Sequence, residues 1–165
     1  MRETAAIKSL DQYTGRLKTC YTDNSLWVSD GSAIIRISDA GKVAKKRWYD
    51  GTIDMSLAED VKYHLQTSYP LVWHTTGISL NAKSLFLCGN AVTAAFDKLI
   101  KLFPGAEFRS YWLNGGSTDI AIYEDKRLMA IIPSYRLTCE EQEIADKIGE
   151  MLDGRVWNAW KKINA

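Results

Sequence analysis

The stretch LFLCGNAVTAAFDKLIKLFPGAEFRSYWLNGGSTDIAIYEDKRLMAIIPSYRL, residues 85–137, carries the strongest structural pattern in the chain. It opens with a β-rich run at 85–88, and Gly89-Asn90 leads into a segment whose apolar residues recur at helical spacing. This spacing predicts a helix over Ala91–Phe103, capped by Asn90 and ended by Pro104-Gly105. The side chains expected to face the core are Val92, Ala95, Phe96, Leu99, Ile100 and Phe103. Three β-rich runs follow at 107–113, 118–123 and 127–132, so the stretch predicts strand–helix–strand–strand–strand.

A simpler version of this order lies at the N-terminal end of the chain. Residues 4–14 form a weakly amphipathic segment with Ile7 and Leu10 on its apolar face, which predicts a helix. Short β-rich runs follow at 17–22, 26–29 and 33–38, and Asp30-Gly31 predicts a hairpin because both residues tolerate positive φ. The two stretches predict a coarse internal repeat without residue-level identity.

The remaining segments are less regular. Residues 39–83 predict a strand at 42–48, a turn at Gly51, a helix capped by Ser56 and running to Gln66, and strands at 71–74 and 77–80. After Leu137, Thr138 and Glu141 have the spacing of a capping box for a helix lined by Ile144, Ile148, Met151 and Leu152. We therefore expect an α+β domain over residues 1–137, built from two strand/helix/three-strand units with antiparallel sheets, and a C-terminal helical extension over residues 138–165.

Composition narrows the class of protein. The chain has 165 residues, 46% of them hydrophobic, with 6 Trp and only 3 Pro, which is typical of a folded domain rather than a disordered chain. Lys and Arg number 21 against 20 Asp and Glu, so only a local basic face could bind nucleic acid. The odd set of Cys20, Cys88 and Cys139 contains no C-x-x-C pair and predicts reduced thiols. The polar N-terminus MRETAAIKSLDQ and the short apolar runs predict a cytoplasmic protein without a signal peptide or membrane segment.

Residues 85–137 resemble the last domain of bacterial DNA polymerase sliding clamps. That domain runs strand, Asn-capped helix and three strands, and ends on a methionine-proline-x-arginine-leucine signature. The corresponding segment here is residues 132–137, IPSYRL, in which Ile replaces Met and one extra residue is present. The run LWVSDGSAIIRI at residues 26–37 is similar to the clamp's strand, threonine-aspartate-glycine turn and strand. The resemblance covers residues 4–38 and 84–137, about half of the chain.

The resemblance implies a fold and a function. Single clamp-like domains look like phage proteins, which would place this chain in the host cytoplasm. Clamp helices line a DNA channel and present cations to phosphates, and the matching residues here are Lys8, Lys98 and Lys101. The expectation is a non-enzymatic clamp-like phage protein acting in DNA replication or DNA binding, with a processivity factor as the implied role. A single domain cannot encircle a duplex, so copies would have to pair through their edge strands. The alternative for these lysines is a solvated helix surface, offset by Glu3, Asp11 and Asp97.

Two further segments could contact partners. In GKVAKKRWYDG, residues 41–51, Lys45 and Arg47 lie beside aromatic residues, which suits a phosphate backbone with a stacked base. The same residues also suit a solvated edge strand protected by lysines. In the tail, Trp157 and Trp160 share a helical face, which favours docking on the body, a homo-oligomer interface or a host protein. The tail supports the alternative function, a phage-encoded inhibitor that binds a host enzyme or defence complex.

Signals for catalysis are weak. His64 and His74 have no metal-ligand spacing, which favours structural or surface roles. Glu124-Asp125-Lys126 matches half of a metal-dependent nuclease pattern but has the composition of a hairpin turn. No phosphate-binding or nucleophile-elbow motif occurs in the sequence. We therefore expect no enzymatic activity, cofactor or metal.

Overall fold

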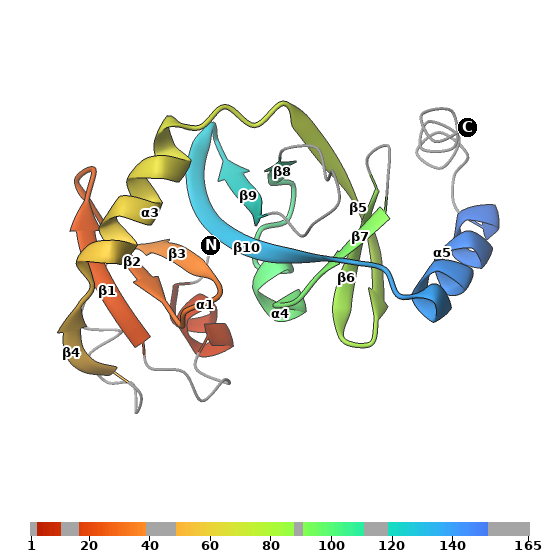
Figure 1. Ribbon diagram of the computed structural model, residues 1–165, viewed down its shortest axis with the longest axis horizontal. Helices are drawn as coiled ribbons and strands as arrows, with labels where there is room; N and C mark the ends of the chain where they lie inside the picture. The colour runs from red at the N-terminus through yellow and green to blue at the C-terminus, as the bar shows by residue number, and fades with distance from the viewer. Residues whose placement is uncertain (1–2, 11–16, 39–48, 88–90, 111–118, 152–165) are drawn as a thin grey trace.

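Strand β10 (Arg127–Arg136) runs through the centre of the molecule in the computed structural model, which describes residues 3–10, 17–38, 49–87, 91–110 and 119–151 (Figure 1). Ala130 and Ile131 pair with β9 (Asp119–Glu124) on one edge and with β3 (Ile34–Ile37) on the other. Further along β10, residues 134–136 pair with β7 (Ala91–Ala94). This change of partner joins two systems of strands into one sheet.

The first system is a closed barrel. Strands β5 (Leu71–Leu80), β6 (Lys83–Leu87) and β8 (Glu107–Ser110) complete the order β10–β7–β6–β5–β8–β9, and β9 returns to β10. The second system continues from β3 through β2 (Ser25–Ser29) and β1 (Leu17–Thr22) to β4 (Tyr49–Ile53). Each described pair is antiparallel except β1–β4, which is parallel. The predicted mixture of helices with a mainly antiparallel sheet is confirmed.

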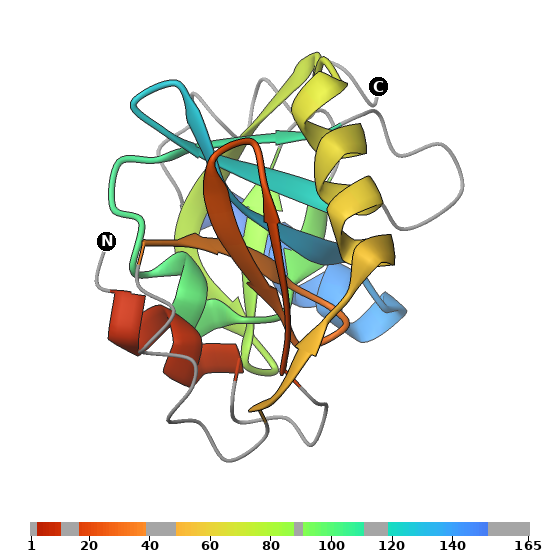
Figure 2. The ribbon, with the colours of Figure 1, turned by 90° about the vertical axis from the view of Figure 1, so that its left-hand side faces the viewer.

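Helices cover both faces of the second strand system. Helix α3 (Met55–Gln66) lies on one side of β1 and β2, and α1 (Glu3–Leu10) lies on the other (Figure 2). In β3, Ile35 belongs to the cluster that includes α1, whereas Ile34 belongs to the cluster under α3. Successive strand residues point to opposite faces, so all four residues of β3 are buried. Ile7 and Leu10 are buried as predicted.

The predicted helix Ala91–Phe103 is wrong in its first half. Residues 91–94 form β7, and helix α4 covers only Asp97–Ile100. Between them Phe96 has φ +65°, a left-handed conformation that a continuous right-handed helix excludes. The predicted burial is nevertheless confirmed for five of the six side chains expected to face the core, and the sixth, Ala95, is partly buried. The five are Val92, Phe96, Leu99, Ile100 and Phe103. A short, mostly apolar strand that is buried on both faces has nearly the same pattern as the first turn of an apolar helical face, and residues 91–94 fit either reading. The expected cap, Asn90, lies outside the described residues.

The middle of the chain also departs from prediction. The two strands expected at 71–74 and 77–80 are one strand, β5, because an irregularity between Thr75 and Ser79 bends it without breaking it. Gly51 lies within β4 rather than in a turn. Helix α3 is capped by Asp54 rather than by Ser56, whose N–H donates to Asp54 Oδ1 at 2.9 Å. The strand predicted at 42–48 lies outside the described residues.

The β1–β2 and β2–β3 hairpins are closed by turns of different geometry. At Asp23-Asn24 both residues have positive φ, 53° and 52°, the pattern of a type I′ hairpin. At Asp30-Gly31 only Gly31 has positive φ, and Asp30 Oδ1 instead accepts the N–H groups of Ser32 and Ala33. The β2–β3 hairpin is therefore closed by a wider loop than predicted.

The C-terminal helix is confirmed as α5 (Cys139–Met151), which stands at the end of the molecule opposite α3 (Figure 1). Its capping box forms as predicted. The N–H of Thr138 donates to Glu141 Oε1 at 3.0 Å, and the N–H of Glu141 donates to Thr138 Oγ1 at 3.2 Å. Over the part of the chain that is described, no helix combines the length and apolar character needed to cross a bilayer.

Candidate functional site

A shallow groove separates α1 from α4, and it brings together two of the three lysines expected on a DNA-binding face. Ala5, Lys8 and Ser9 line one side of the groove, and Lys98 and Leu102 line the other. Both lysines are exposed, and neither has a carboxylate partner among the described residues. The groove therefore brings together two exposed cations from segments that are distant in the sequence.

The third predicted lysine, Lys101, is already neutralised. Its Nζ lies 2.7 Å from Asp97 Oδ2. The Asp97 carboxylate also accepts hydrogen bonds from the hydroxyls of Ser79, at 3.1 Å, and Ser84. Burial alone would raise the pKa of Asp97, but the bonds from Lys101 and the two serines outweigh it and hold the pKa below its ordinary value. Asp97 thus links α4 to the β5–β6 hairpin through its hydrogen bonds, and it forms an ion pair with Lys101.

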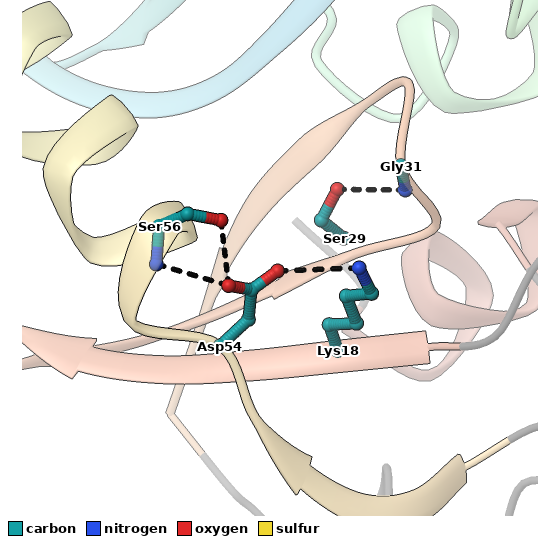
Figure 3. A network of polar contacts seen from close by, with 5 residues as sticks. All are labelled: Lys18, Ser29, Gly31, Asp54 and Ser56. Atoms are coloured by element: carbon teal, nitrogen blue, oxygen red, sulfur yellow. Dashed lines mark hydrogen bonds and ion pairs between the residues drawn. The ribbon is translucent and has the colours of Figure 1, made fainter.

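A second hollow, the α3 cleft, lies between α3 and the strands β1–β3 and β9. Its polar lining includes Lys18, Asp54, Asp60, His64 and Asp119. Asp54 accepts from both the N–H and the hydroxyl of Ser56, and its Oδ2 lies 3.3 Å from Lys18 Nζ (Figure 3). The hydrogen bonds from Ser56 and Lys18 keep the pKa of Asp54 below its ordinary value. Asp54 is therefore an ionised helix cap, already paired with Lys18.

His64 is the most enclosed titratable group of the α3 cleft. Its Nε2 lies 3.3 Å from Asp119 Oδ2, and its Nδ1 is hydrogen-bonded to the hydroxyl of Tyr69. Both ring nitrogens are engaged, so His64 ties α3 to β9 and to the segment after the helix. Sequence spacing showed no acidic partner for His64, because Asp119 is far away along the chain. His74, the other histidine, is exposed on β5.

Large apolar side chains are exposed beside the α3 cleft. Ile53 is 69% exposed, Met55 73% and Tyr63 62%. We name these three residues the apolar patch. Tyr63 also lines the α3 cleft, together with the carboxylates of Asp60 and Asp119. Such a combination suits a protein segment that carries both apolar and basic side chains.

Four residues singled out in the sequence, Lys45, Arg47, Trp157 and Trp160, lie outside the described residues. The Glu124-Asp125-Lys126 segment is a hairpin turn, with Asp125 and Lys126 at φ 51° and 63°. Within the described ranges, no three His, Cys, Asp or Glu side chains converge on a point where a metal ion could bind. Cys20 is a buried free thiol and Cys139 an exposed one.

Comparisons of the chain with protein-family models, curated proteins and solved structures found no match. The resemblance to sliding clamps therefore stays a prediction. Sequence reasoning missed the α3 cleft, since Lys18, Asp54 and Asp119 come from three separate segments. The only local signal was the acidic residue before the apolar repeat of α3, which marks a helix cap as readily as a site.

Proposed function

We propose that this chain is a non-enzymatic, clamp-like protein that binds the DNA backbone through the face formed by α1 and α4. The observation that carries the proposal is the groove in which Lys8 and Lys98 lie on either side, neither of them paired with a carboxylate of the described residues. Both lysines were expected on one face from the resemblance to clamps, in which helices present cations to phosphates without reading bases. Such binding is sequence-independent and strongly dependent on salt.

The arrangement of the helices supports the same proposal. In each predicted unit a helix precedes three strands: α1 before β1–β3, and α4 before β8–β10. The two helices pack against each other at one side of the molecule (Figure 1). Because α4 has only 4 residues, the face is smaller than two full helices would form. We therefore expect weak binding, governed by the number of phosphates contacted.

Assembly into a ring through strand pairing requires two open sheet edges in each copy. Among the described strands the barrel closes one end of the sheet, and β4 is the strand left at the other. We therefore restrict the proposal to backbone binding by the α1–α4 face. Molecular mass in solution, measured with and without DNA, tests separately whether copies assemble on the duplex.

The decisive experiment is a titration of duplex DNA at several salt concentrations. Lys8→Gln with Lys98→Gln should weaken binding and lower the salt slope by about 1.8, because each phosphate contact contributes about 0.9. The matched control is Lys101→Gln, which removes a lysine of the same region that Asp97 already neutralises. An equal effect of the control, or an unchanged slope in the double variant, would remove this face from DNA binding.

A second function has its own observation. The apolar patch and the acidic α3 cleft beside it favour an inhibitor that binds a host enzyme or defence complex through protein contacts. Exposed large apolar side chains grouped next to charges are typical of protein interfaces. This surface lies on α3, away from the α1–α4 groove, so the two functions can be tested independently.

The test of this second function is affinity capture from host lysate with matched variants. Met55→Glu places a charge in the apolar patch, and Val72→Glu places one at another exposed apolar residue, on β5. A protein retained by the wild type and by Val72→Glu, but lost with Met55→Glu, would support the inhibitor function. Identical capture by all three proteins would rule out the patch as the binding surface.

A further inference from the structure

One arginine, Arg36, is buried in the sheet and forms no ion pair with a described carboxylate. Arg36 lies in β3 between isoleucines and is 6% exposed. Its Nε donates to the Leu128 carbonyl at 2.8 Å, and Nη1 donates to the Ser25 hydroxyl at 2.5 Å. Its guanidinium also lies over the Trp27 ring, 4.4 Å from the centroid. Within the described residues the remaining N–H groups of the guanidinium have no acceptor, and no carboxylate forms an ion pair with it.

A second arginine faces the same place. Arg127, at the start of β10, reaches the Ser25 hydroxyl at 3.4 Å. Both arginines line a pocket of about 290 Å³ at the end of the sheet, where the β1–β2 hairpin, the end of β3 and the start of β10 meet. Burial lowers the pKa of Arg36 and the positive charge of Arg127 lowers it further, while Asp23 acts in the opposite direction. Two like charges are thus held around one cavity.

Two carboxylates lie near the pocket, and neither forms a direct ion pair with Arg36 among the described residues. Glu3 lines the wall, and its Oε1 accepts the N–H of Ser38 at 2.8 Å, a contact that closes α1 onto the end of β3. Asp23 acts on Arg36 at a distance, without a direct ion pair among the described residues. A buried charge is costly unless it is paired, and guanidinium groups bind phosphate through parallel N–H···O bonds.

We propose that Arg36, Arg127 and Ser25 form a binding site for the phosphate group of a small phosphorylated molecule. A doubly charged phosphate matches two guanidinium groups better than a singly charged carboxylate does. The rest of the pocket suits an organic body, because Leu26, Ile37 and Met129 line it and Tyr21, 71% exposed, stands at its rim. The ligand class is therefore a phosphate monoester with an apolar or aromatic body. This site is separate from the Lys8–Lys98 groove and does not depend on DNA binding.

The experiment is a titration with inorganic phosphate that is monitored by ¹H–¹⁵N NMR. Chloride replaces phosphate in the reference samples, so that the ionic strength stays constant. The Arg36 Nε–H and the Ser25 amide should shift and saturate. Arg127→Gln should weaken phosphate binding about tenfold, the effect of losing one charge-assisted contact. Arg136→Gln is the matched control, since Arg136 is exposed at the other end of the same strand, and it should leave the affinity unchanged. Both variants alter exposed side chains, so folding is not at risk.

Further probes decide the ligand class. Phenyl phosphate should bind more tightly than inorganic phosphate, and Tyr21→Ala should reduce that gain. Acetate at equal ionic strength should bind at least tenfold more weakly than phosphate. Shifts that fail to saturate, an equal effect of Arg127→Gln and Arg136→Gln, or equal binding of acetate would each overturn the proposal and leave Arg36 as a purely structural link between β3 and β10.

Discussion

Phe96 combines deep burial with a left-handed backbone, and comparing alanine with glycine at this position separates the effects of these two properties on stability. The side chain is 5% exposed, within the cluster that α1 and the barrel share. Phe96→Ala should therefore lower the free energy of unfolding by about 3–5 kcal/mol, the usual cost of such a cavity. Its φ of +65° adds a cost of about 1–2 kcal/mol that any L-residue carries but glycine does not.

Phe108 is the matched control, because it is also 5% exposed but lies in the regular strand β8. At Phe108, glycine should be less stable than alanine by about 0.5–1 kcal/mol, the usual penalty of glycine inside a strand. At Phe96 glycine should be at least as stable as alanine, because relief of the left-handed backbone offsets that penalty. The difference between the two Ala-to-Gly comparisons should be about 1–2 kcal/mol.

Urea unfolding followed by tryptophan fluorescence measures all four variants by linear extrapolation. If glycine is worse than alanine by the same amount at both positions, Phe96 is not left-handed in solution. The helix expected over Ala91–Phe103 would then be restored, and the assignment of β7 would be wrong. A loss below about 1 kcal/mol in Phe96→Ala would instead show that this side chain is not buried.

Three further substitutions test local features. Thr93 is 0% exposed, and its hydroxyl has no hydrogen-bond partner among the described residues. Thr93→Val should therefore raise the free energy of unfolding in urea by about 1 kcal/mol. A loss of that size would show that the hydroxyl forms a hydrogen bond. Ala82→Gly should stabilise by up to about 1 kcal/mol, because Ala82 has φ +61° in the β5–β6 turn; unchanged or lower stability would contradict this geometry. Burial would raise the pKa of Glu141, but the bonds from Thr138 and Lys83 lower it overall. Its contribution is therefore present above the pKa of an unfolded glutamate, about 4.3, and is lost as the pH falls through the folded-state value. Glu141→Gln should cost about 1 kcal/mol at pH 7, and the difference from the wild type should shrink below about pH 4; a difference that does not change with pH would contradict the ionised capping box.

Features set by neighbouring residues were predictable. The Thr138–Glu141 capping box depends on groups three positions apart, and it forms as expected. The apolar period of α3 lies within one helix, and its buried residues Leu57 and Val61 follow from that spacing. The type I′ turn at Asp23-Asn24 likewise depends on residues that tolerate positive φ locally. In each case the interaction that selects the backbone lies within a few residues, so no distant partner was needed.

The functional surfaces depend on distant pairings. Only the packing of α1 on α4 brings Lys8 and Lys98 to the same groove. The resemblance to clamps had predicted that these two lysines lie on one face. Nothing suggested that Arg36 would meet Arg127, although an arginine inside the apolar run AIIRIS is an unusual residue for a buried strand. Their meeting requires β3 to pair with β10 in one particular register.

What the sequence by itself determined is most of the apolar pattern: which apolar residues are buried, where several turns fall, where α3 ends and where α5 begins. What only the tertiary structure decided is the backbone state of Ala91–Ala94 and the partners of Lys8, Arg36 and His64. A short apolar run is nearly as favourable in a helix as in a strand, so hydrogen bonds from β6 and β10 select the strand at β7. Side chains from separate segments meet only where the sheet fixes their register, and a one-residue slip would move every one of them to the opposite face.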